Sequence, residues 1–130
     1  MVTFRTVAVG EQEIKLVMNA YVPMAYRART QRDLIADLGR TEKAMHDAVK
    51  ALPEGASDKE RETASIGAVD ISVFANLGYI MAEEAGMEMP PSTKEWLRSF
   101  ENPAMIYKLI VPILELWREA NKTTSIPAKK

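Results

Sequence analysis

The N-terminal part of the chain combines short apolar runs with β-branched residues, as β-strands do. The stretches VTFRTVAV (2–9) and EIKLVM (13–18) flank the turn-like GEQ. Two such runs joined by a short turn predict a β-hairpin over residues 2–18. Because an isolated hairpin is only marginally stable in water, we expect it to pack on the helices or to pair with another strand.

From residue 19 onward the apolar residues follow the spacing of helices. Asn19 can cap a helix that begins AYVPMAY. Leu34, Ile35 and Leu38 then form one apolar face, and Gly39 is predicted to interrupt it. A second helical pattern, TEKAMHDAVKAL, follows and ends before the loop PEGA.

The strongest helix start in the chain is a capping box formed by Ser57 and Glu60. It predicts a helix that runs to about Ala85 and stops at Gly86. The apolar ridge of this helix consists of Ile66, Val69, Val73, Leu77 and Ile80. Small residues line another side, where we expect a second helix to approach closely: Ala64, Gly67, Ala68, Ala75, Gly78 and Ala82.

A second capping box, Ser92 with Glu95, predicts a short helix over TKEWLRSFE. Its large apolar residues lie on one side, and they are Trp96, Leu97 and Phe100. Asn102 then caps the last helix, whose first residue is Pro103, a favoured position for proline.

The last helix has a wider apolar face than packing on a domain surface requires. On a helical wheel its apolar residues cover an arc of roughly 220°, whereas packing needs only about 100°. Pro112 lies on the narrow polar stripe, where we expect it to bend the helix. Two explanations stay open: the helix is central and surrounded by its own chain, or part of the arc is buried against a second protein or another copy. The arc consists of Ile106, Tyr107, Leu109, Ile110, Val111, Ile113, Leu114, Leu116 and Trp117.

These patterns predict a mainly α fold: a compact helical domain of about five helices with a small N-terminal β-hairpin. The single domain is expected to span residues 1–120. The remaining segment, 121–130, lacks an apolar face and is predicted to be a flexible C-terminal tail.

Composition excludes several classes of protein. The chain has 130 residues, a formal net charge of −1 and no cysteine, so a disulfide framework is excluded and no general attraction to nucleic acid or anionic lipid follows. The N-terminus does not resemble a signal peptide, and the apolar run near the C-terminus is too short and too charged for a membrane span. We therefore expect a cytoplasmic protein with neither nucleic acid nor membrane as a partner.

Catalysis has no support in the residues. The one histidine, His46, stands beside Asp47, and Glu83 and Glu84 are adjacent and so point in different directions. No Gly-rich phosphate loop, Ser-His-Asp set or metal-ligand spacing is present. We predict a protein that is not an enzyme and has no catalytic, cofactor-binding or metal site, and a small-ligand pocket in the helical core has the least support.

An alternative function comes from residues 31–52, QRDLIADLGRTEKAMHDAVKAL, which resemble the helix-turn-helix of winged-helix DNA-binding regulators. In that interpretation Gly39 occupies the turn and Thr41 caps the second helix. The residues that would read DNA are Arg40, Lys43, His46 and Lys50. Four acidic residues would approach the phosphates and oppose binding: Asp33, Asp37, Glu42 and Asp47.

The C-terminal third, STKEWLRSFENPAMIYKLIVPILELWREANKTTSIPAKK, resembles the end of the tail assembly chaperones of long-tailed, siphovirus-like bacteriophages and prophages. The family shows an E-W-L-x-x-F element, a helix ending in L-W and a Thr/Pro/Lys tail. The matching residues here are Glu95, Trp96, Leu97, Phe100, Leu116, Trp117, Thr123, Thr124, Pro127, Lys129 and Lys130.

An upstream segment, AYRARTQRDLIADL, is similar to the family pattern Y-R-x-x-F-G-x-D-L. The match is carried by Tyr26, Arg27, Asp33 and Leu34. It departs from the pattern where Thr30 and Gln31 replace the usual Phe-Gly. NLGYIMAEEAG also fits, so the resemblance spans most of the chain.

The resemblance implies a non-enzymatic chaperone that binds the tape measure protein, keeps it soluble and recruits tail tube protein. It also implies self-association, a location in the bacterial host cytoplasm, absence from the mature virion and, in many members, a longer form made by frameshifting. An apolar helix-binding surface would suit this role. The expected partner-binding residues are Trp96, Leu97, Phe100, Ile110, Ile113, Leu116 and Trp117.

Overall fold

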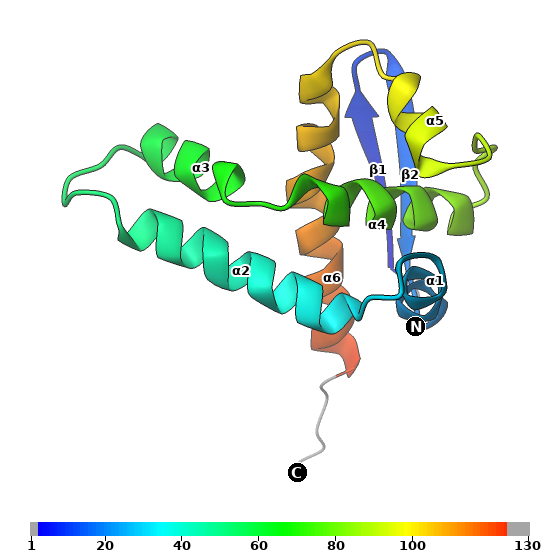
Figure 1. Cartoon of the computed structure of the whole chain (residues 1–130), viewed down its shortest axis with the longest axis horizontal. Coiled ribbons are helices and arrows are strands. Elements are labelled where there is room, and N and C mark those ends of the chain that lie inside the picture. Colours follow the sequence, from blue (N-terminus) through cyan, green and yellow to red (C-terminus); the bar gives the residue numbers. More distant parts are fainter. Residues whose placement is uncertain (1–2, 125–130) are drawn as a thin grey trace.

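The predicted hairpin is present in the computed structural model, which describes residues 3–124, with side chains as far as residue 121 (Figure 1). Strand β1 (Thr3–Val9) pairs antiparallel with β2 (Gln12–Met18), and Val9 lies opposite Gln12. Gly10 and Glu11 form the turn, and Gly10 has φ 64°, a left-handed value that glycine adopts without strain.

One face of the hairpin is buried under helices. Its buried apolar side chains belong to Val9, Ile14, Leu16 and Met18. Their register places them on the same side of the two strands, where helices α4 (Ile71–Glu84) and α6 (Ile110–Thr124) contact the hairpin (Figure 1). The hairpin therefore packs on helices, as expected of an element that is marginal alone.

Helix α4 (Ile71–Glu84) lies at the centre of the domain, and nine of its residues are buried. It contacts β2, helix α1 (Tyr21–Thr30), helix α5 (Thr93–Arg98), the 3-10 helix η1 (Pro103–Leu109) and helix α6 (Ile110–Thr124). A helix that is apolar on most sides is stable in water only when other elements surround it. The mainly α fold with a small hairpin is confirmed.

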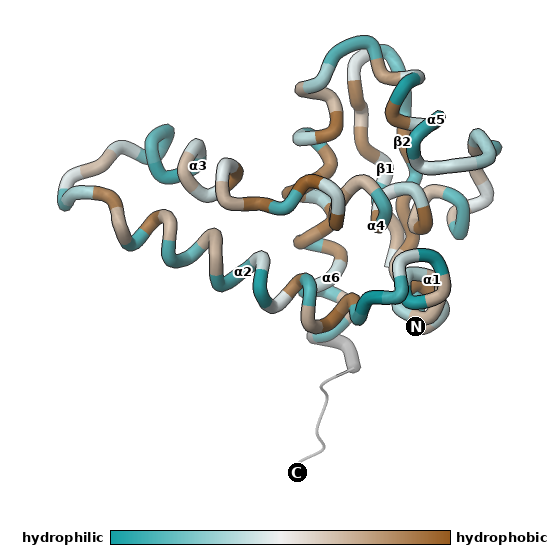
Figure 2. The backbone as a smooth tube through the Cα atoms, viewed as in Figure 1, coloured by the Kyte–Doolittle hydropathy of each residue, from teal (hydrophilic) through white to brown (hydrophobic). Residues whose placement is uncertain are grey.

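Helices α2 (Leu34–Lys50) and α3 (Asp58–Gly67) project from this body as an arm (Figure 1). None of the residues of α3 is buried. Figure 2 shows hydrophilic residues along much of α3 and hydrophobic ones where the chain leads into α4. The arm is therefore held mainly by contacts between α2 and α3 themselves.

The single helix predicted from Ser57 to Ala85 is wrong. The capping box of Ser57 and Glu60 is formed, but the chain bends by 82° between α3 and α4. The carboxylate of Asp70 starts the second helix by accepting a hydrogen bond from the amide of Ser72 at 3.0 Å. The bend lets the charged α3 stay in solvent while the apolar α4 enters the core.

The predicted interruption at Gly39 is also wrong, and so is the alternative interpretation that placed the turn of a helix-turn-helix at this residue. Helix α2 runs through Gly39 without a break and begins after Asp33, whose side chain accepts a hydrogen bond from the amide of Ala36. The turn lies earlier, at residues 31–33, where Gln31 has φ 60°. A glycine inside a helix costs only about 1 kcal/mol relative to alanine, so its neighbours can hold it there.

Two of the residues predicted to read DNA are paired within α2. Arg40 pairs with Asp37, and the Nζ of Lys43 lies 2.8 Å from Oδ2 of Asp47. The pairs neutralise part of the charge that DNA phosphates would need.

The last helical segment begins where predicted, with Asn102 accepting a hydrogen bond from the amide of Ala104 and with Pro103 in the first position. Its first part is the 3-10 helix η1, and α6 starts only at Ile110. Pro112 thus lies in the first turn of α6, where an amide has no partner within the helix. The expectation that Pro112 lies inside one continuous α-helix is therefore wrong.

Helix α6 reaches Thr124, so residues 121–124 are helical although they were predicted to belong to the tail. Residues 125–130 of that tail lie outside the described residues. Between residues 3 and 124 no single helix has the length and hydropathy needed to cross a membrane. Only the bent pair of α3 and α4 passes such a test, by length and composition alone.

Candidate functional site

The seven residues expected to bind a partner separate into two groups. The buried group consists of Trp96, Ile110, Ile113 and Leu116. The half-buried group consists of Leu97, Phe100 and Trp117, all packed against the core. In this structure the first group supports the fold, and only the second group has side-chain surface that a partner could touch.

The wide apolar arc of the last helix is covered mostly by the chain itself. Only Tyr107 and Val111 are clearly exposed, with 42% and 45% of their surface accessible. Of the two explanations that the sequence left open, the central position in the domain accounts for the arc. The other explanation, burial of part of the arc against a second protein or another copy, applies only to Tyr107, Val111 and the half-buried Trp117.

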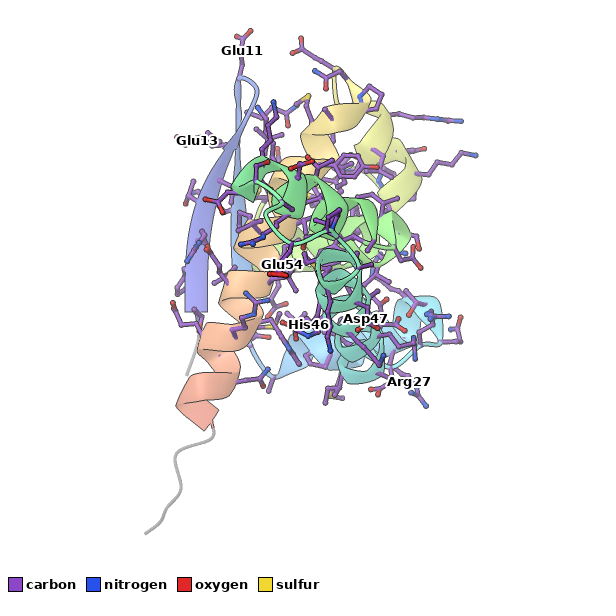
Figure 3. The ribbon with its side chains drawn as sticks, turned by 90° about the vertical axis from the view of Figure 1, so that its left-hand side faces the viewer. Glu11, Glu13, Arg27, His46, Asp47 and Glu54 are labelled. Atoms are coloured by element: carbon purple, nitrogen blue, oxygen red, sulfur yellow. The ribbon has the colours of Figure 1, made fainter. Side chains whose placement is uncertain are left out.

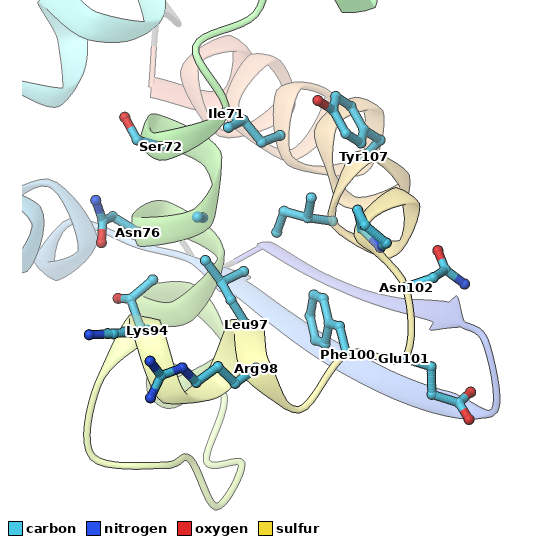
Figure 4. A pocket seen from close by; sticks show the side chains of 14 residues that line it. Ile71, Ser72, Asn76, Lys94, Leu97, Arg98, Phe100, Glu101, Asn102 and Tyr107 are labelled. Atoms are coloured by element: carbon cyan, nitrogen blue, oxygen red, sulfur yellow. The ribbon is translucent and has the colours of Figure 1, made fainter.

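An apolar groove lies between α4, α5 and η1 (Figure 4). Its volume is about 820 Å³. We call it the α4–α5–η1 groove, and it is lined by Ile71, Ser72, Ala75, Asn76, Thr93, Lys94, Leu97, Arg98, Phe100, Glu101, Asn102, Pro103, Ile106 and Tyr107. Leu97 and Phe100 are thus the two predicted partner-binding residues that the structure brings together at an accessible surface.

Trp96 positions one wall of the groove. Its indole packs edge-on against the rings of Tyr79 and Phe100, with ring centroids 6.0 and 5.0 Å apart. The hydroxyl of Tyr79 donates a hydrogen bond to the carbonyl of Pro90 at 2.5 Å. This bond fixes the position of the segment before α5. Because Trp96 is buried and its neighbours are fixed, Leu97 and Phe100 are held toward the groove.

Side-chain caps fix the residues at which α5 and η1 begin. The hydroxyl of Ser92 accepts a hydrogen bond from the amide of Glu95 at 3.2 Å, and Asn102 caps η1. Of the capping box predicted for Ser92 and Glu95, only this half is formed. The two predicted caps therefore place the short helix α5 and the following η1 on either side of Phe100. Each cap contributes about 1 kcal/mol to the helix that it starts.

Charged groups line the groove unevenly. Lys94 and Arg98 are exposed on α5, and neither side chain has an ion-pair partner among residues 3–121. Glu101 lies beyond Phe100, at the opposite end in Figure 4. The groove thus has an apolar centre, a basic end and an acidic end.

A second cluster of charged groups surrounds the buried carboxylate of Asp37. Arg32 donates hydrogen bonds from Nε and Nη2 at 2.8 and 2.7 Å, the hydroxyl of Tyr26 donates another at 2.7 Å, and Arg40 pairs with the same carboxylate. The hydrogen bonds from Arg32 hold the pKa of Asp37 below its usual value, although burial opposes them. Burial raises the pKa of the Tyr26 phenol above its usual value, and the hydrogen bond to Asp37 adds to this effect.

The hydrogen bonds of this cluster stabilise the fold. It links α1 to the start of α2, and every buried side-chain nitrogen and oxygen of the described residues has a hydrogen-bond partner. The adjacent hollow measures only about 170 Å³. Tyr26, which carries part of the upstream family resemblance, therefore stabilises the fold.

His46 lies on the arm beside Asp47. Figure 3 shows Glu11 and Glu13 on the hairpin, away from that pair. Within residues 3–121, no group of three or more His, Asp or Glu side chains is arranged to hold a metal ion.

Sequence reasoning missed the walls of the groove that α4 and η1 contribute. The sequence analysis placed Ala75 in the stripe of small residues and Ile106 and Tyr107 in the apolar arc, and it did not single out Ile71. The available signals were the polar hydroxyl of Tyr107 within that arc and the small Ala75 in the stripe. Neither signal predicts a groove without the arrangement of the three elements.

Searches against family models, curated proteins and solved structures found no match for this chain.

Proposed function

We propose that this chain is a non-enzymatic tail assembly chaperone of a long-tailed phage or prophage, which binds the tape measure protein and promotes assembly of the tail tube. It acts in the cytoplasm of the bacterial host, associates with further copies of itself around the client and is absent from the mature virion. Tail tube protein is the second partner, reached through a longer, frameshifted form where one is made.

The observation that carries the proposal is the position of the E-W-L-x-x-F element. Two of its apolar residues, Leu97 and Phe100, line an accessible groove, while Trp96 supports them from the core. The most distinctive part of the family resemblance therefore forms a surface and not only the interior. A surface of this kind supports a binding function.

The shape and chemistry of the groove suit a helical client. Amphipathic helices bind by laying apolar side chains at positions i, i+3 or i+4 and i+7 into a hydrophobic groove. The α4–α5–η1 groove, of about 820 Å³, is large enough for several such side chains. A tape measure protein is a long helical protein in this family, so each chaperone would cover a short stretch.

The proposal is tested by co-expressing the chain with the tape measure protein of the same phage or prophage. Soluble client and complex formation are measured after purification, and affinity for a client fragment is measured by calorimetry. Two variants target the groove without removing core residues: Tyr107→Asp places a charge at its rim, and Asn76→Trp fills it from α4. We expect each to weaken binding at least tenfold, because an anchor in a groove contributes about 1–2 kcal/mol or more.

The matched control is Tyr21→Asp, which introduces the same charge at an exposed tyrosine on α1 that does not line the groove. Circular dichroism and thermal unfolding establish that all three variants fold. Full binding by both groove variants, or a wild-type chain that is strictly monomeric and has no affinity for the client, would overturn the proposal.

A further inference from the structure

Strand β1 has a free hydrogen-bonding edge. Val9 and Gln12 flank the two-residue turn of the hairpin, so they form a hydrogen-bonded pair, and every second residue of β1 before Val9 also bonds to β2. The residues between them are Phe4, Thr6 and Ala8, whose amides and carbonyls therefore point away from β2. Among the described residues, no other element supplies a hydrogen-bond partner for these groups.

The opposite edge of the hairpin is partly covered. Lys15 of β2 lies opposite Thr6, so its amide points away from β1, and it donates a hydrogen bond to Sδ of Met87 at 3.2 Å. The segment that follows α4 therefore contacts the outer edge of β2. This contact also supports the alternation given above, because an amide within the ladder would bond to β1 instead.

Helix α6 covers a face of β1 and not its edge. Because side chains alternate along a strand, Arg5 shares the inner face of the hairpin with Val7 and Val9. Arg5 pairs with Glu115 of α6, so α6 lies on that face. Figure 3 shows Glu13, a residue of the outer face of β2, on the other side of the strands from α6.

The free edge lacks the features that usually prevent strand pairing. Proteins protect such edges with lysine, proline, a bulge, a very short strand or a charge that points inward. Strand β1 has seven residues, contains neither lysine nor proline, and pairs with β2 without a bulge. Its one charge, on Arg5, does point inward, but Glu115 neutralises it.

The side chains along this edge are complementary to those of a second copy. Phe4, Thr6 and Ala8 are uncharged and exposed, and 72% of the Phe4 surface is accessible. If two β1 strands pair antiparallel with Thr6 on the two-fold axis, Phe4 lies beside the small Ala8 of the other copy. All three residues then exchange backbone hydrogen bonds, and no like charges stand opposite each other.

We infer that β1 is the surface through which two copies of this chain associate, and that their hairpins join into one antiparallel sheet. The inference rests on the proposed function in one respect, because that function requires copies to associate, and it names the surface that does so. It does not depend on the α4–α5–η1 groove. A dimer of this kind carries two grooves, and two linked sites hold one long client more tightly than either site alone.

The test measures the mass of the full chain over a concentration series by analytical ultracentrifugation. Thr6→Pro removes the free amide at the axis without removing a bond to β2, and we expect it to raise the dissociation constant of the dimer by about tenfold or more. The matched control is Glu13→Pro, which makes the same change at an outward-pointing amide of β2 and should preserve the dimer. Circular dichroism and thermal unfolding establish that both variants fold.

Charges at the axis test the same geometry without proline. Thr6→Glu faces Lys15 within its own hairpin, which favours folding, but it places two carboxylates side by side in the dimer. Thr6→Lys places two ammonium groups there. Each variant alone should be monomeric at concentrations where the wild type is dimeric, whereas an equimolar mixture of the two should form a heterodimer.

Loss of the dimer in the Thr6 variants, with its recovery in the mixture, supports the inference whether or not the chain binds a tape measure fragment. A wild-type chain that stays monomeric at its highest soluble concentration overturns it, and so does a dimer that the Thr6 variants leave intact. In both of these cases the proposed function is still judged by binding of the client. A monomeric chain whose affinity for the client fragment falls with Thr6→Pro would mean that β1 pairs with the client, which also overturns the inference.

Discussion

The indole of Trp96 lies directly against the backbone of Gly78 in the middle of α4. A Cβ atom at Gly78 would lie 3.3 Å from Cη2 of Trp96 and 3.6 Å from Cδ1 of Ile113. The absence of a side chain at Gly78 thus leaves room for Trp96 of α5 and Ile113 of α6 to pack against α4. The stripe of small residues predicts a close approach there, and the approaching group is the side chain of Trp96.

Replacing Gly78 by valine should destabilise the protein by about 2 kcal/mol, because the added methyl groups would overlap Trp96 and Ile113 in a filled core. Urea unfolding monitored by tryptophan fluorescence measures the change. The displaced indole should also disturb Leu97 and Phe100, so affinity for the client fragment should fall beyond the loss explained by unfolding. A fully stable variant would mean that Trp96 does not pack on α4.

Replacing Gly39 by alanine should instead stabilise the protein by about 1 kcal/mol. Gly39 is exposed inside α2, and no neighbouring side chain lies within 4 Å of the place that an alanine methyl group would occupy. Alanine therefore adds helix propensity without a clash. The measurement is the same urea titration. Destabilisation would show that Gly39 has the left-handed conformation of a turn, as the helix-turn-helix interpretation requires.

Replacing Asp37 by asparagine should lower the free energy of unfolding by about 3 kcal/mol at neutral pH, because it leaves Arg32, Arg40 and Tyr26 around an uncharged group. Since the folded pKa of Asp37 lies below its unfolded value of about 3.9, its contribution is complete above that pH and is lost as the pH falls through the folded pKa. Urea unfolding of both proteins, measured at neutral pH and in acid, checks the change.

The difference between the wild type and Asp37→Asn should therefore shrink in strongly acidic solution. Asp58→Asn is the control, because the Asp58 side chain is fully exposed and its nearest cation lies 3.9 Å away. It should change stability by less than about 0.5 kcal/mol at either pH. A difference for Asp37 that does not depend on pH would contradict a role for its charge.

Replacing Ser57 by alanine should loosen α3 alone. The substitution removes one half of a capping box, worth about 1 kcal/mol, from a helix with no buried residue. Hydrogen exchange should show faster exchange of the α3 amides by about fivefold, with the urea midpoint of the whole domain unchanged. Ser92→Ala, the same change at α5, should lower global stability because Trp96 joins α5 to the core. Equal global losses would mean that the arm unfolds together with the body.

Elements defined by nearby residues could be read from the sequence alone. The hairpin, the starts of α3, α5 and η1 and the mainly α fold all follow from β-branched runs or from caps at Ser57, Ser92 and Asn102. A capping hydrogen bond connects residues only two or three positions apart, so its sequence pattern contains the whole interaction. The continuity of α2 and the break before α4 were predicted wrongly, because a glycine in a helix and a cap inside an apolar pattern each differ from their alternatives by only about 1 kcal/mol.

The candidate site depended on tertiary structure. Sequence alone determined that residues 96–117 carry more apolar side chains than an ordinary surface helix, and it grouped Leu97 with Phe100. Only the packing of α4, α5, η1 and α6 decided that Ile110, Ile113 and Leu116 are enclosed while Leu97, Phe100 and Tyr107 border a groove. Burial is set by which distant segments cover a side chain, and helical spacing specifies the face of a helix but not what lies against it.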